Sequence, residues 1–163
     1  MQSIFKVPAD YGCLALVDPK SYQAFVGEDW AIRGLKGHLL EQAARERVFA
    51  WGCAYGNHRV AIEFLTSDRF PDIEAPACLQ VIATAGHFIL TDYDALANSA
   101  QYEDESLIDQ GSSHLIEAPA GRYACRVVRF DEETAEVDFL VQLAPIEPDR
   151  AIGPVQIPWS DIP

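Results

Sequence analysis

The sequence predicts a mainly β protein, an antiparallel β-sandwich of about eight or nine short strands with one α-helix, at approximately 31–47, packed on it. Short segments in which apolar and polar residues alternate recur along the chain between turns rich in Gly, Pro and Asp, and this spacing is typical of a sandwich. A parallel α/β fold would need several crossover helices, whereas only one segment has a helical period.

The expected strands are short. Apart from a hairpin at residues 121–143, described below, they are residues 3–8, 11–17, 48–54, 59–65, 79–83, 87–92 and 113–118. Residues 55–58 predict a turn between two of them, and Ala85-Gly86 predicts a hairpin between the two strands that flank it. Phe25 and Trp30 are expected to be buried against the core.

The segment 31–47 carries the helical signal. Asp29 is the expected N-cap, and Glu41 and Arg45 lie one turn apart on the polar side, where they can pair. The apolar stripe that would pack on a sheet consists of Ile32, Leu35, Leu39 and Ala43.

Residues 121–143 give the clearest pattern and predict two strands that fold back on each other. In the first strand Tyr123, Cys125 and Val127 alternate with polar or small residues, and the alternation resumes after an acidic turn. We expect the arginines of the first strand to face carboxylates of the second, each pair contributing about 0.2–1 kcal/mol. Pro145 ends the ladder.

Residues 1–145 are expected to form a single β-sandwich domain, and residues 146–163 an extended Pro-rich C-terminal tail. After Pro145 the alternation is lost. Trp159 or Ile157 would anchor the tail to the domain, and a linker to a partner is the alternative.

Negative charge is concentrated in the second half of the chain. The 163 residues have a formal net charge of −13. Residues 92–149 hold fourteen acidic residues against three arginines, whereas residues 1–91 hold ten acidic and eight basic residues. Nucleic-acid binding needs clustered Lys and Arg, so the charge argues against it. The negative field serves either solubility or the binding of a basic partner.

The cysteines lie far apart in apolar segments and form no CxxC motif, which favours reduced core thiols of a cytoplasmic protein over a zinc site. They are Cys13, Cys53, Cys78 and Cys125. A disulfide in an exported protein is the alternative. The N-terminus lacks the features of a signal peptide, and no apolar run approaches the ~18 residues that span a membrane, so we expect no membrane association.

No motif points to an enzyme, a metal site or a cofactor. GxSxG, phosphate-loop and dinucleotide-binding motifs do not occur, and Asp92 and Asp94 lack the rest of a calcium loop. No metal-binding spacing connects the histidines, which are His38, His58, His87 and His114. A hydrolase is still an alternative, because catalytic residues need not be neighbours in sequence.

The segment 92–112 combines aromatic and aliphatic residues with carboxylates, a composition that suits a basic protein partner. A solvated loop is the alternative. A short helix is expected near 93–99. The candidate partner-binding residues are Asp92, Tyr93, Asp94, Tyr102, Glu103, Asp104, Glu105 and Asp109.

The hairpin also carries a motif: Pro119-x-Gly121-x-Tyr123-x-x-Arg126-Val127, the acidic turn, then Asp138-Phe139-Leu140-Val141-Gln142-Leu143-x-Pro145. Together with Phe49-Ala50-Trp51 and residues 60–64, this motif resembles a bacterial β-sandwich group that includes competence protein J-like proteins and DNA-entry nuclease inhibitors. The resemblance covers residues 48–145. The group often ends its last strand with Trp-Pro, where this chain has Ala144-Pro145.

The resemblance implies a non-catalytic sandwich that acts as an inhibitor or an immunity protein. Combined with the acidic segment, it leads us to expect a cytoplasmic bacterial protein that neutralises a basic effector, such as a toxin or nuclease, by occluding it. The alternatives are a small-molecule or peptide-binding β-sandwich, which a deep mixed pocket would favour, and a hydrolase. The sequence predicts no oligomeric state.

Overall fold

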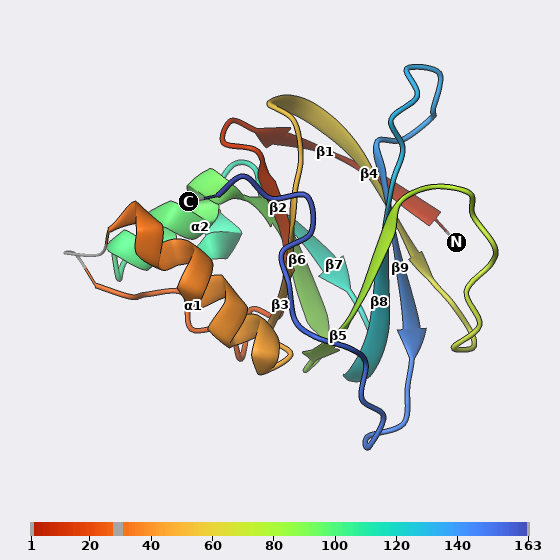
Figure 1. Ribbon diagram of the computed structural model, residues 1–163. Helices are drawn as coiled ribbons and strands as arrows, with labels where there is room; N and C mark the ends of the chain where they lie inside the picture. The colour runs from red at the N-terminus through yellow and green to blue at the C-terminus, as the bar shows by residue number, and fades with distance from the viewer. Residues whose placement is uncertain (1, 28–30, 163) are drawn as a thin grey trace.

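The computed structural model describes residues 2–27 and 31–162 and arranges them in three layers (Figure 1). A five-stranded sheet forms one outer layer, a four-stranded sheet lies in the middle, and two α-helices cover the far side of the four-stranded sheet. This arrangement confirms the predicted mainly β sandwich with a helix packed on it. None of the described helices is long and apolar enough to cross a membrane.

The five-stranded sheet has the order β1-β4-β9-β8-β5. Its strands are β1 (Gln2–Ala9), β4 (Gly56–Phe64), β9 (Phe139–Pro145), β8 (Gly121–Arg129) and β5 (Ala77–Thr84). Three of its four pairings are antiparallel, as predicted, but β4 and β9 run parallel. The reason is that the connection after β4 returns the chain to the other edge of the sheet, where β5 runs in the same direction as β4. The antiparallel strands β8 and β9 then fill the space between them, which leaves β9 parallel to β4.

The predicted hairpin of β8 and β9 is confirmed, with Arg126 opposite Gln142 in its register. The expected arginine–carboxylate pairs across these strands are wrong. Because β9 begins only at Phe139, the carboxylate of Asp138 lies before the ladder, where it accepts a hydrogen bond from the backbone N–H of Arg59 at 2.7 Å.

The arginines of β8 have other partners. Arg126 donates through Nε to Gln142 Oε1 at 2.9 Å, and Arg129 lies 3.0 Å from the carboxylate of Asp131 in the loop after the strand. Arg122 donates through Nε to Glu46 at 2.7 Å, which ties β8 to the end of the first helix.

The four-stranded sheet has the order β3-β2-β6-β7. Its strands are β3 (Val48–Gly52), β2 (Cys13–Val17), β6 (His87–Asp92) and β7 (His114–Glu117). The predicted hairpin around Gly86 is wrong, because β5 pairs with β8 and β6 pairs with β2 and β7, so the chain changes sheets there. Residues 56–58 of the predicted turn at 55–58 belong to β4. The strands on either side of this position, β3 and β4, lie in different sheets, so the chain changes sheets here too.

The strands β3 and β2 of the four-stranded sheet are buried on both faces, and all five residues of β2 are fully buried, whereas the edge strand β7 leaves Leu115 exposed. Leu14 and Leu16 point into the core between the sheets, which also contains Trp51. Cys13 and Ala15 belong to a second core, under the helices. The sheet therefore needs the helical layer to cover its second apolar face.

The helix α1 (Ile32–Ala44) packs on this sheet within the predicted range, and Leu35 and Leu39 are fully buried in the second core. Glu41 and Arg45 form the expected pair at 3.3 Å. The helix begins after Ala31. Asp29, the predicted cap, and Trp30 lie outside the described residues.

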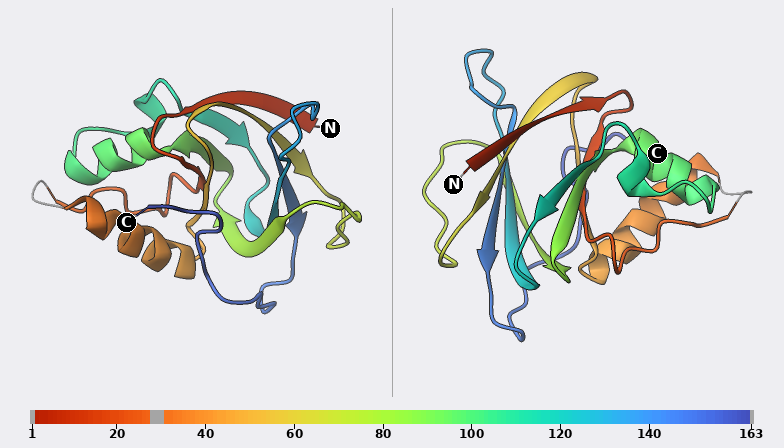
Figure 2. Two further views of the ribbon diagram at one scale, coloured as in Figure 1. Left: turned by 45° about the horizontal axis from the view of Figure 1, so that its top comes forward. Right: turned by 180° about the vertical axis from the view of Figure 1, so that it is seen from behind.

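Residues 146–162 contain no helix or strand and cross from the five-stranded sheet back to the helices (Figure 2). The ring of Trp159 lies 6.4 Å from that of Phe139, and Ile157 packs against the second core. The Pro158 carbonyl accepts a hydrogen bond from Gly52 N–H at 2.7 Å. A Cβ atom at Gly52 would overlap the Trp159 carbonyl, so the segment can lie here only because residue 52 is glycine.

Gly52→Ala should therefore destabilise the protein by about 1–3 kcal/mol, because the backbone of the C-terminal segment must move away from β3. Urea unfolding followed by tryptophan fluorescence measures this loss. Gly153→Ala is the matched control: it lies in the same segment, its Cβ would meet no atom within 4 Å, and the change should stay within about 0.5 kcal/mol. Equal stabilities of the two variants would contradict the close packing.

Candidate partner-binding face

The predicted acidic segment is built on the second helix, α2 (Tyr93–Gln101), with Asp92 as its N-cap. Asp92 Oδ1 accepts hydrogen bonds from Ala95 N–H at 3.1 Å and from Ser112 Oγ–H at 2.9 Å. One carboxylate thus caps the helix and also binds Ser112, at the C-terminal end of the segment 92–112. Because Asp92 is only 2% exposed, its contacts serve the fold.

Tyr93 also lies inside the domain, with its ring 5.4 Å from that of Tyr11. Asp94 is half-buried at the edge of the helix. Burial, and then the nearby charges of Asp92 and Asp10, raise the pKa of the Asp94 carboxyl above its ordinary value.

The remaining candidates lie together on the acidic loop, which we define as residues 102–109. Its exposed side chains include Tyr102, Glu103, Asp104, Glu105 and Asp109. These five predicted site residues share one surface. Among the described residues, the loop and α2 contain no basic side chain, and none of the ion pairs in that part of the chain involves a carboxylate of the loop.

The acidic loop is held in place by its own hydrogen bonds and by one buried anchor. Leu107, in the 3-10 helix η1 (Leu107–Asp109), is buried in the second core. Gln110 Nε2 donates to Glu105 Oε2 at 2.9 Å, and Glu105 N–H donates to the Tyr102 carbonyl at 3.2 Å. Its carboxylates are therefore displayed from a folded loop rather than from an extended one.

An apolar cleft of about 350 Å³ opens between the acidic loop and residues 19–25. Phe25 and Ile108, which are 43% and 45% exposed, line it together with Glu103 and Glu105. The prediction that Phe25 is buried is wrong. We call this cleft and the acidic loop together the acidic face.

The position of Phe25 follows from contacts that the sequence pattern does not reveal. The backbone N–H groups of Val26 and Gly27 donate to the carbonyl of Ala100, at the end of α2, at 2.9 and 3.1 Å. These bonds hold residues 19–27 against the helix and leave Phe25 and Val26 at the surface. The only sign of this exposure in the sequence is that Phe25 and Val26 lie between turns, outside any segment with a helical or strand period.

The other acidic cluster does not join this face. Residues 131–133 lie in the loop between β8 and β9, at the opposite end of the molecule from α2 (Figures 1 and 2).

The histidines make ordinary contacts. His38, His58 and His114 each donate from Nε2 to a backbone carbonyl, at 2.6, 2.7 and 2.9 Å. In the described part of the chain, no three His, Cys, Asp or Glu side chains gather as a metal site. All four cysteines are free thiols.

Asp92→Ala should lower the free energy of unfolding by about 1–2 kcal/mol, because the cap of α2 is lost. Asp92→Ser should recover most of this loss, since a serine hydroxyl can also cap a helix. Asp94→Ala is the control, two residues away and half-buried, and should change stability by about 0.5 kcal/mol or less. Chemical denaturation compares the three variants, and a loss at Asp94 equal to that at Asp92 would contradict the assigned cap.

No protein-family model and no curated protein matches this sequence. Two solved structures are similar to it. "Crocagin biosynthetic gene J" has a TM-score of 0.60 at 14% identity, covering 90% of this chain and 98% of that chain. ComJ from Bacillus subtilis, described as an inhibitor of the DNA degrading activity of NucA, has a TM-score of 0.54 at 9% identity, covering 88% and 96%. At these identities the likeness shows the fold alone, and that fold is the ComJ-like β-sandwich that the hairpin motif predicted.

Proposed function

We propose that this protein is a non-catalytic inhibitor or immunity protein that occludes a basic protein effector, such as a toxin or nuclease, through its acidic face. The observation that carries the proposal is the combination of an apolar cleft, lined in part by Glu103 and Glu105, with the other exposed carboxylates of the acidic loop, which contains no basic side chain.

The composition of the face supports a protein partner. Protein interfaces place aromatic and aliphatic anchors at the centre and polar groups at the rim. Phe25 and Ile108 line one cleft, Tyr102 belongs to the acidic loop beside it, and all three side chains are more than 40% exposed. They would supply the anchors, and the carboxylates of the acidic loop would form the rim.

The charge supports a basic partner. A surface of one sign raises the rate of association with a partner of the opposite sign by about 10- to 1,000-fold at low salt. Since the net charge of the chain is −13, the whole molecule adds to this attraction. The carboxylates would also cover cationic groups that an effector uses to hold its own substrate.

The fold is compatible with this role. ComJ, one of the two similar structures, is described as an inhibitor of a nuclease, whereas the other is described as a biosynthetic protein. A shared fold does not carry a shared function, so the proposal depends on the acidic face itself.

Reversing three carboxylates of the acidic loop, with Glu103→Lys, Asp104→Lys and Asp109→Lys together, should weaken binding to the effector at least about 10-fold, mainly through slower association. The effector is obtained by capture on the immobilised wild-type protein from the cells that make it. Its activity is then measured with and without added inhibitor, and its binding kinetics by surface plasmon resonance.

The matched control is Glu132→Lys, Glu133→Lys and Glu136→Lys, which changes the net charge equally in the exposed loop between β8 and β9. It should retain nearly all of the affinity. The proposal fails if both triple variants lose affinity equally, if neither does, or if the captured protein keeps its full activity when saturated with inhibitor.

A further inference from the structure

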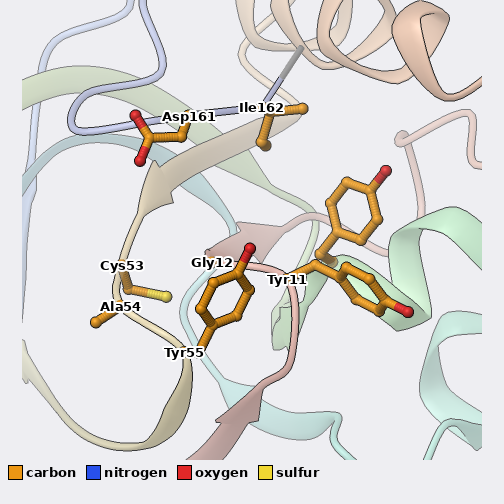
Figure 3. A pocket seen from close by; sticks show the side chains of 8 residues that line it. Tyr11, Gly12, Cys53, Ala54, Tyr55, Asp161 and Ile162 are labelled. Atoms are coloured by element: carbon orange, nitrogen blue, oxygen red, sulfur yellow. The ribbon is translucent and has the colours of Figure 1, made fainter.

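A second cleft, of about 230 Å³, opens at the other end of α2 (Figure 3). Four separate parts of the chain form it: the turn between β1 and β2, the connection from β3 to β4, the start of α2, and the C-terminal segment. We call it the tyrosine cleft. Its lining residues are Tyr11, Gly12, Cys53, Ala54, Tyr55, Tyr93, Asp161 and Ile162.

Two of its tyrosines have most of their side-chain surface exposed to solvent. Tyr11 is 57% and Tyr55 76% exposed, and Figure 3 shows them on two sides of Gly12. The ring of Tyr11 packs at 5.4 Å against Tyr93, which is buried below it. The cleft therefore offers aromatic surface on more than one side.

The charge around these rings is negative. Asp161 is one of the lining residues, and Asp10, exposed, precedes Tyr11 in the chain. Asp161 also lines the adjoining cleft, which contains His58 and Arg129. Burial, and then the charge of Asp92, raise the pKa of the Cys53 thiol to about 12, so the thiol is neutral at physiological pH. None of the described residues that line the cleft is basic.

Aromatic faces and a carboxylate around one cleft are the combination that holds an organic cation. A cation within about 6 Å of a tyrosine ring is attracted to the electrons of its face. A guanidinium group suits this site better than an ammonium group, because it is flat, stacks on aromatic rings, and can donate two parallel hydrogen bonds to a carboxylate.

We propose that the tyrosine cleft binds a guanidinium group, and that its occupant is an arginine side chain of the basic effector. This inference rests on the proposed function. The half-buried or exposed side chains of α2, Asp94, Asn98 and Gln101, run from this cleft to the acidic face. A helix of nine residues spans only about 13 Å, so one partner can cover both.

The first experiment uses the protein alone. Ethylguanidinium is titrated into it while the NMR signals of the tyrosine rings are followed, and ethylurea, similar in shape but uncharged, is the control ligand. We expect saturable shifts of the Tyr11 and Tyr55 signals with ethylguanidinium only, reduced at least fivefold in affinity in Asp161→Asn. Shifts that are equal for the two ligands, or that do not saturate, would overturn the inference.

The second experiment uses the effector. Tyr55→Ala should weaken its binding about 10-fold or more, and Tyr55→Phe should retain most of the affinity, because the aromatic face persists. If the acidic-loop reversal abolishes binding while Tyr55→Ala leaves it unchanged, the cleft is not the arginine site and the proposed function stands. If ethylguanidinium binds at the cleft but the acidic-loop reversal has no effect on the effector, the proposed function fails instead.

Discussion

The strands β3, β2 and β6 of the four-stranded sheet have two apolar faces, and the rest of the structure is arranged to cover both. All five side chains of β2 are excluded from solvent, alternating between the core against the five-stranded sheet and the core against the helices. A two-layer sandwich would leave the second face in water, at an unfavourable free energy of about 25 cal/mol for each Å² of apolar surface. Covering that face places α2 at the surface, with the acidic face beside its C-terminal end and the tyrosine cleft at its N-terminal end.

Buried carboxylates fix the connections around this sheet. Asp92 caps α2 and binds Ser112, so that the two ends of the acidic segment meet at one side chain. Asp18, at the end of β2, accepts hydrogen bonds from Ser21 N–H at 3.0 Å and from Thr84 Oγ–H at 3.1 Å. Not all of the negative charge is available to a partner, because these two groups are committed to the fold. The carboxylates of the acidic loop face water.

The sequence patterns predict the positions of the helices and strands better than they predict which strands pair with each other. The hairpin of β8 and β9 and the helix α1 are confirmed, because alternation and helical spacing report directly on a buried face. The same alternation does not say which strand lies alongside, so the change of sheet at Gly86 and the parallel pairing of β9 were missed. Five of the eight predicted site residues share the acidic loop, whereas the exposure of Phe25 depends on tertiary hydrogen bonds that no local pattern encodes.

We propose that the acidic face binds a basic protein. Hydrogen–deuterium exchange of the protein, free and bound to its captured effector, tests this most directly, because it locates the contact without altering any residue. We expect slower exchange in residues 102–109 of the bound protein, and unchanged exchange in residues 131–136 of the β8–β9 loop. Protection confined to that loop or to the five-stranded sheet would contradict it.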